Sequence, residues 1–334
     1  MTTPINSIFE VANQGHFNRL ALETFRFQAE SCEVYKSYLN LLSVDSNQVT
    51  SVQEIPFIPI ELFKTHTVYG GAHPPQHLFT SSATTGMSPS KHFIADLSIY
   101  EESFIRAFRL LFGAPEHYTI LALLPSYSER QDSSLIYMVN RLMQLSGATE
   151  NGFYLYNHQD LYHQLVSLRD KGKRTLLFGV SFALLDFIKN YTIDFPELEI
   201  IETGGMKGRG VELTRTALHQ QIEQGLGTCH ISSEYGMAEL LSQSYAKEGK
   251  LFTSPPWMRV LIRDLHDPFR FLPNKERGGI NIIDLANRYS CAFIQTHDLG
   301  TLHTNNTFEL LGRIPFTELR GCNLLLLPDA CPIA

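Results

Sequence analysis

Two kinds of hydrophobic pattern alternate along the chain: segments with apolar residues at helical spacing, and short runs of consecutive apolar residues. Residues 8–45 and 96–112 place apolar side chains at intervals of three and four, which is the spacing of a helix with one buried face. Similar spacing at 134–145 and 182–188 predicts two more helices. The chain is therefore expected to open with a helical segment and to carry several helices afterwards.

Short apolar runs lie between these helices and predict strands. Runs at 119–125, 175–179 and 198–202 have the length and composition of buried parallel strands. Because helices and strands alternate, the sequence predicts a layered α/β fold with a largely parallel sheet. Four further short runs predict a smaller β-rich subdomain and lie at 260–263, 279–284, 292–296 and 307–311.

The pattern divides the chain into four regions. The segment at 55–60 holds two prolines, so it is expected to be an extended connector and not a helix or a central strand. The predicted regions are a helical opening segment at 1–50, an α/β core at 51–255, a β-rich subdomain at 256–312 and a C-terminal stub at 313–334.

Composition narrows the class of partner. The 334 residues suffice for one or two domains, and the formal net charge of −7 without a basic cluster favours a small molecule over nucleic acid. No signal peptide or apolar run of spanning length is seen, so we expect a cytoplasmic protein. The five cysteines are odd in number and lack a C-x-x-C pair, which argues against a disulfide framework or a zinc site.

A hydroxyl-rich loop at 79–92 is the first candidate for binding chemistry. Small residues let backbone N–H groups converge on a phosphate, and Lys91 adds a positive charge. A flexible linker has the same composition, and the spacing matches neither the common phosphate loop nor G-x-G-x-x-G. The candidate phosphate-binding residues, with Lys91, are Ser81, Ser82, Ala83, Thr84, Thr85 and Gly86.

Three further motifs follow this loop. At 203–207 a glycine pair follows a predicted strand and could let the backbone lie flat against a nucleotide base. The alternative is that these residues form an ordinary turn. At 233–239 a stacking aromatic, a glycine and a carboxylate suited to magnesium occur together, the alternative being a buried tyrosine and a solvated glutamate. At 296–300, Asp298 is expected between a strand and a turn. There its carboxylate can accept hydrogen bonds from both ribose hydroxyls, or it can cap a helix or turn.

The order of these motifs, closing with Gly312-Arg313, resembles the adenylate-forming superfamily of acyl-CoA synthetases, peptide-synthetase adenylation domains and luciferases. The resemblance covers residues 55–325. Within it, the segments at 55–66 and 124–135 and the Lys91-His92 pair are similar to the acyl-protein synthetase branch. It implies that a carboxylic acid, expected to be a fatty acid, reacts with ATP to give acyl-AMP and pyrophosphate, and that the acyl group then moves to a thiol.

The resemblance also implies roles for single residues. The loop and Lys91 would hold the phosphates of ATP, and Glu239 would bind Mg²⁺. Adenine and ribose would be held by Gly204, Gly205, Met206, Glu234, Tyr235, Gly236, Asp298 and Arg313. Ala83 stands where the superfamily usually has glycine, and we expect the superfamily's C-terminal domain, with its second lysine, to be absent.

The thiol that receives the acyl group has several candidates. By resemblance it is a cysteine near the C-terminus, which gives Cys322, with Cys331 behind it; a buried structural thiol is the alternative. The acceptor can also belong to a partner, such as an acyl-accepting reductase or an acyl carrier protein. Two rival functions are a ligase that uses coenzyme A and a nucleotide-binding scaffold without catalysis.

Overall fold

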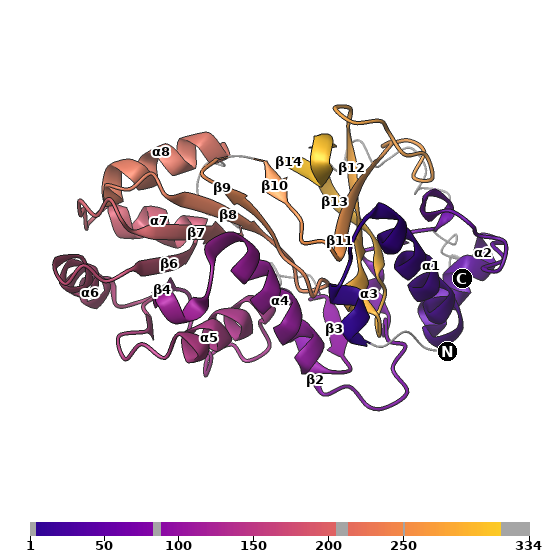
Figure 1. The fold of residues 1–334 in the computed structure, drawn as a ribbon, viewed down its shortest axis with the longest axis horizontal. Coiled ribbons are helices and arrows are strands. Elements are labelled where there is room, and N and C mark those ends of the chain that lie inside the picture. Colours follow the sequence, from indigo (N-terminus) through magenta and orange to yellow (C-terminus); the bar gives the residue numbers. More distant parts are fainter. Residues whose placement is uncertain (1–4, 83–87, 205–212, 250, 315–334) are drawn as a thin grey trace, which may run out of the picture.

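The chain folds around one large sheet with helices on both faces (Figure 1). The computed structural model describes residues 5–82, 88–204, 213–249 and 251–314. Within these ranges the sheet has twelve strands, which run parallel at one end and mainly antiparallel at the other. None of the helices in these ranges is long and apolar enough to cross a bilayer.

The parallel end of the sheet is covered on both faces. Its strands, in spatial order, are β5 (Gly152–Phe153), β4 (Thr119–Leu123), β6 (Thr175–Val180), β7 (Glu199–Thr203) and β8 (Ile231–Tyr235). Figure 1 shows α7 (Ser181–Ile188) and α8 (Arg215–Leu226) along one face, with α4 (Leu97–Phe112) and α5 (Ser134–Ser146) along the other. The helix α6 (His158–Asp170) lies beside α7. All residues of β4 and β6 are buried as a result.

The sheet continues beyond β8 through antiparallel strands. In spatial order these are β9 (Ser244–Lys247), β10 (Phe252–Thr253), β14 (Thr307–Arg313), β13 (Phe293–Leu302), β12 (Arg277–Asp284) and β11 (Met258–Arg263). The short strand β10 pairs with both β9 and β14, and the rings of Phe252 and Phe308 stack at 5.2 Å beside this ladder. The β-rich part therefore belongs to the same sheet as the α/β part.

The N-terminal helices pack against the β-rich end (Figure 1). Helix α1 (Gln14–Ser31) begins where the Asn13 side chain accepts a hydrogen bond from the His16 N–H, and its buried Phe25 meets the ring of Phe293 at 6.0 Å. After α2 (Glu33–Leu41), the connector is extended as predicted. Within it β1 (Ile58–Pro59) pairs with β13, and α3 (Leu62–Thr65) follows.

Short 3-10 helices also occur in the described residues. They are η1 (Ile5–Phe9), η2 (Val52–Glu54), η3 (Pro115–His117), η4 (Leu285–Asn287) and η5 (Thr304–Asn306).

Trp257, the one tryptophan in the sequence, is buried where three segments meet. Its ring contacts the edge of Phe9 in η1 at a centroid distance of 5.1 Å. Its indole Nε1 lies 3.0 Å from the hydroxyl oxygens of both Ser103 on α4 and Ser242 before β9. The side chain therefore links the start of the chain, the α/β layer and the segment that follows β8.

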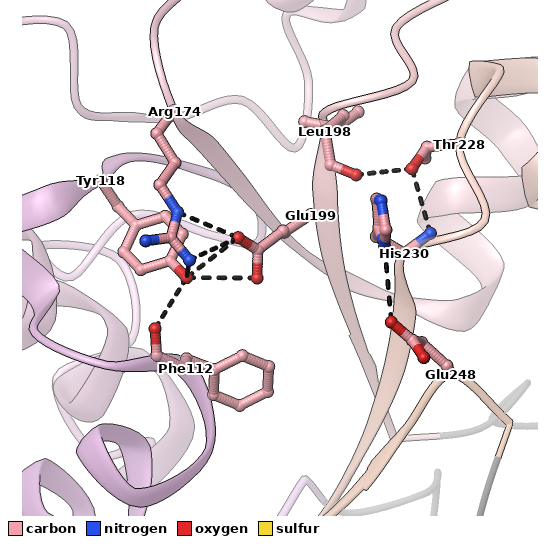
Figure 2. Close-up of polar contacts among 8 residues, drawn as sticks. All are labelled: Phe112, Tyr118, Arg174, Leu198, Glu199, Thr228, His230 and Glu248. Atoms are coloured by element: carbon pink, nitrogen blue, oxygen red, sulfur yellow. Dashed lines mark hydrogen bonds and ion pairs between the residues drawn. The ribbon is translucent and has the colours of Figure 1, made fainter.

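The amino ends of the parallel strands carry a polar cluster (Figure 2). Glu199 accepts hydrogen bonds from Arg174 at 2.9 Å and from the Tyr118 hydroxyl at 3.0 Å, and the Arg174 guanidinium stacks 4.2 Å from the Tyr118 ring centre. The Thr228 hydroxyl donates to the Leu198 carbonyl at 2.7 Å. These contacts connect the starts of β4, β6, β7 and β8. The opposite, carboxyl-terminal edge is where open α/β sheets bind ligands.

The predicted fold class is confirmed, and so are the helices and strands named from the apolar pattern. The structure adds α6 and α8, which the sequence analysis did not predict. Both are polar helices that bury one stripe: Leu161, Leu165 and Leu168 in α6, and Leu218, Ile222 and Leu226 in α8. That spacing is a helical signal within otherwise polar sequence.

Candidate functional site

The strands β7 and β8 end side by side and carry the first candidate residues. Thr203 and Glu234 are register partners, and the Thr203 hydroxyl donates a hydrogen bond to the Glu234 carboxylate. Gly204 follows β7 with a φ of 72°, a left-handed conformation that favours glycine. Gly205 and Met206 lie outside the described residues. The strand ends thus place a glycine in a left-handed conformation next to a carboxyl group.

Glu234 is partly buried at the end of β8. Burial raises the pKa of this carboxyl to about 7, while the hydrogen bond from Thr203 opposes the rise. A Cβ atom on Gly236 would meet Oε1 of Glu234, so a larger residue there would require the Glu234 carboxylate to move. The chain turns away after Tyr235, where β8 ends.

Asp298 is joined to the end of β8 by a hydrogen bond. The Tyr235 hydroxyl donates to Oδ2 of Asp298 at 2.7 Å, and the Asp298 side chain is only 15% exposed. Burial raises the pKa of Asp298, while the Tyr235 hydrogen bond and the Arg313 charge oppose that rise. Arg313 Nε lies 3.8 Å from Oδ1, but its side chain is 86% exposed, so this ion pair contributes little to stability.

The local structure at Asp298 corrects one prediction. We expected this residue between a strand and a turn, but it lies inside β13. The strand continues because β14 pairs along its second half, with Asp298 opposite Arg313. The ladder shifts register between Leu299 and Gly300, and such irregularities re-aim neighbouring side chains.

Glu239 is buried in the loop after β8, with 5% of its surface exposed. Burial raises the pKa of its carboxyl, and the facing Ser90 hydroxyl and the Lys64 charge oppose the rise. The described residues contain no group of three or more His, Cys, Asp or Glu side chains that could enclose a metal ion. Mg²⁺ usually takes only one or two carboxylates from a protein and completes its shell with water and substrate phosphates. Glu239 fits a magnesium ion of that kind.

The candidate phosphate loop joins the two strands of a separate hairpin, β2 (His77–Thr80) and β3 (Lys91–Ile94). The Ser81 N–H donates to the Ser90 carbonyl at 3.1 Å, and the Ser90 N–H donates to Ser81 Oγ at 2.9 Å. The base of the loop is therefore closed, with Ser82 and Lys91 exposed beside it. The remaining loop candidates, Ala83, Thr84, Thr85 and Gly86, lie outside the described residues.

Two side chains support this region without having been singled out from the sequence. Arg263 is buried and donates to the Thr296 carbonyl at 2.8 Å, two residues before Asp298; burial lowers the pKa of its guanidinium to about 10. Asp132 anchors the hairpin, since its carboxylate accepts a hydrogen bond from the Thr80 hydroxyl and its backbone carbonyl accepts one from the Thr80 N–H at 2.8 Å. No sequence pattern distinguishes Arg263 from a charged residue that simply ends an apolar run.

The candidate acyl acceptors Cys322 and Cys331 lie outside the described residues. Within those residues, Cys32 and Cys291 are buried, and burial raises the pKa of both thiols. Cys229 is exposed but precedes β8 at the amino ends of the strands, the edge opposite the site. No cysteine in the described part of the chain is therefore placed to take an acyl group from this site.

The arrangement combines groups suited to different parts of a nucleotide. These groups lie near the ends of β7 and β8 and the middle of β13: Gly204 with the Glu234 carboxyl, the hydrogen-bonded carboxylate of Asp298, and the buried carboxylate of Glu239. Ser90, which precedes Lys91 in the chain, lies close to the Glu239 carboxyl. Hydrogen bonds and charge interactions join Tyr235, Asp298, Arg313 and Glu239, whereas Ser81, Ser82 and Lys91 lie on the hairpin of β2 and β3.

Comparisons with known proteins were made on the sequence and on the structure. The family model described as "Acyl-protein synthetase, LuxE" matches residues 4–329. The "Long-chain-fatty-acid--luciferin-component ligase" of Photorhabdus luminescens is 33% identical over 70 residues, which are 21% of this chain and 60% of that protein. The match thus spans less than two thirds of this relative's length.

Solved structures share the fold at low sequence identity. A 2-hydroxyisobutyryl-CoA ligase in complex with 2-HIB-AMP and CoA superimposes with a TM-score of 0.68 at 12% identity, covering 91% of this chain and 76% of that chain. ATP-bound MatB from Rhodopseudomonas palustris gives a TM-score of 0.51 at 14% identity, covering 71% and 47% of the two chains. Because the family model matches nearly the whole length, this chain belongs to the acyl-protein synthetase family.

Proposed function

We propose that this protein is an ATP-dependent ligase that activates a carboxylic acid and transfers the acyl group to a thiol. In the first step a carboxylate oxygen attacks the α-phosphorus of ATP, and the bond to the β-phosphate oxygen breaks to release pyrophosphate. In the second step a thiolate attacks the acyl carbon and AMP leaves. The observation that carries the proposal is that Asp298, in the middle of β13, lies close to Tyr235 and Glu239 beyond the end of β8, where the start of β3 at Lys91 is held by the bond from His92 to Ala238.

Each group has a role that suits its environment. Asp298, oriented by Tyr235, accepts hydrogen bonds from both ribose hydroxyls. The turn at Gly204 and the Glu234 carboxyl border the adenine, and Lys91 with Ser81 and Ser82 binds the phosphates. Glu239 would hold Mg²⁺, which when bound offsets negative charge on the phosphates. Fixed donors and charges of this kind stabilise the charge that develops on departing pyrophosphate.

We further propose that the acid is a fatty acid and that the first acceptor is Cys322. The name of the Photorhabdus luminescens relative supports a long-chain fatty acid. The exclusion of Cys32, Cys229 and Cys291 on burial and position supports an acceptor outside the described residues or on a partner protein.

The first test is ATP–pyrophosphate exchange with a panel of fatty acids, which requires no thiol acceptor. Wild type is expected to exchange in the presence of Mg²⁺, and Glu239→Gln is expected to lose exchange. Glu248→Gln is the matched control, because Glu248 lies at the amino edge of the sheet near His230 (Figure 2). Absence of exchange with every acid, together with ATP binding, would instead support a non-catalytic scaffold.

The acceptor is tested with a labelled fatty acid and ATP. We expect a protein-bound label that survives denaturation, is released by hydroxylamine, and disappears in Cys322→Ala but not in Cys331→Ala. The rival reaction uses coenzyme A as the acceptor, and it is favoured by the likeness to a CoA ligase fold. Turnover with coenzyme A and no covalent label in wild type would establish the rival.

A further inference from the structure

His92, the residue after Lys91, is buried in the centre of the molecule with 1% of its surface exposed. Its Nδ1 lies 2.8 Å from the carbonyl oxygen of Ala238, and its Nε2 lies 2.9 Å from the hydroxyl of Ser290. The ring of Phe63 on α3 packs edge-on against the imidazole at 5.6 Å. One imidazole therefore connects three segments that are far apart in the sequence.

The partners fix which nitrogen of His92 carries the proton. A backbone carbonyl can only accept, so Nδ1 donates to Ala238, and Nε2 of the neutral ring accepts from the Ser290 hydroxyl. Burial lowers the pKa of His92 to about 4, which keeps the ring neutral near neutral pH. The ring thus acts as a fixed donor and acceptor and not as a charge.

The loop that carries Glu239 is held from its other side as well. The Asn287 amide donates to the Glu239 carbonyl at 2.7 Å. The N–H groups of Leu241 and Ser242 each donate to the buried Asp284 carboxylate at 2.9 Å. Together with the bond from His92 to Ala238, these contacts fix the backbone just before, at and just after Glu239.

We propose that His92 is a positioning residue that fixes the Glu239 carboxylate relative to Lys91, so that both groups meet the same phosphate chain. The inference rests on the proposed function, in which Glu239 and Lys91 face the phosphates of ATP. The chain connectivity makes the coupling direct: Lys91 adjoins His92, and Ala238 adjoins Glu239. His92 itself does not touch the nucleotide in this proposal.

The test is a set of double-mutant cycles on ATP affinity, measured by calorimetry on the full chain with Mg²⁺ present. His92→Phe keeps the ring contact with Phe63 and removes both hydrogen bonds, and it is expected to weaken Mg·ATP binding about 10-fold. In a Glu239→Gln background the same change should cost less than about 2-fold, because the group that it positions is already lost. In an Asp298→Ala background the loss should stay about 10-fold. His92→Asn, which retains a donor and an acceptor, should recover most of the affinity.

The outcomes separate this inference from the proposed function. Coupling to Glu239 with additivity toward Asp298 supports positioning, whereas equal losses in all three backgrounds, or no loss in His92→Phe, overturn it. If His92→Phe does not fold, Ser290→Ala takes its place in the double-mutant cycles, because it removes one of the two hydrogen bonds of His92. Coupling to Glu239 and additivity toward Asp298 are then judged in the same way. Failure of wild type to bind ATP would overturn the proposed function, and the positioning role with it.

Discussion

Removal of one hydroxyl, in Tyr235→Phe, tests the central contact of the candidate site. The Tyr235 hydroxyl donates to Asp298 at 2.7 Å, and the acceptor is a mostly buried carboxylate. Hydrogen bonds to charged groups contribute about 1.5–3 kcal/mol, so we expect the variant to lose about 2 kcal/mol of stability. Over 334 residues the entropy of unfolding is about 0.7 kcal/mol/K, which makes the expected fall in melting temperature about 3 °C.

The same change should alter the pH dependence of ATP binding. Asp298 must be ionised to accept from both ribose hydroxyls, and the Tyr235 hydrogen bond opposes the rise in its pKa. Without that hydrogen bond the carboxyl takes up its proton at a higher pH. As the pH is lowered, ATP affinity in Tyr235→Phe should therefore begin to fall earlier than in wild type, which calorimetric titrations at a series of pH values would measure.

Tyr245→Phe is the matched control. Tyr245 is a fully buried tyrosine on the neighbouring strand β9, and among the described residues its hydroxyl has the Met138 sulfur as its hydrogen-bond partner, at 4.0 Å. Its loss should leave both the melting temperature and the pH profile close to those of wild type. If Tyr235→Phe melted within about 1 °C of wild type and kept its pH profile, the coupling of Tyr235 to Asp298 would be refuted.

Three further changes probe the site and its surroundings. Asp298→Ala should weaken ATP binding by about 2 kcal/mol, and an unchanged calorimetric affinity would remove Asp298 from the ribose role. Burial raises the pKa of Asp284 to about 6 from 3.8, so the native state holds this proton more tightly than the unfolded state. The free energy of unfolding should thus fall by about 3 kcal/mol as the pH rises from about 4 to 6. Urea titrations at several pH values should show this fall in wild type but not in Asp284→Asn. The same pH dependence in both proteins would contradict the assignment. Arg174→Met should cost less than about 1 kcal/mol of stability, because the Arg174 side chain is half exposed and Glu199 keeps its hydrogen bond from Tyr118. ATP affinity should not change, and a weakened affinity would show that the amino edge contributes to the site.

The sequence predicted helices and strands well where the local pattern of apolar residues alone determines them. The runs at 119–125 and 175–179 are apolar throughout because β4 and β6 are covered on both faces. The leucines of α6 recur at helical intervals for the same reason, since one stripe of that helix is buried. Such features depend on near neighbours in the chain.

Features that depend on distant segments were not predicted. Asp298 was expected to lie at the end of a strand, and only the pairing of β13 with β14 extends the strand past it. Likewise, His92 was noted as part of a resemblance, but its bonds to Ala238 and Ser290 join residues 146 and 198 positions away. A periodic pattern carries no information about such contacts, because they depend on how the hairpin docks on the sheet.

The burial of a single tryptophan gives the molecule its own optical probe. Trp257 lies against Phe9, and its indole N–H meets Ser242, whose backbone N–H is held by the same Asp284 carboxylate that fixes the Glu239 loop. Its emission should respond when the N-terminal segment separates or when this loop loosens, without interference from a second indole. Time-resolved fluorescence of the unlabelled protein can therefore follow order in the Glu239 loop during nucleotide binding.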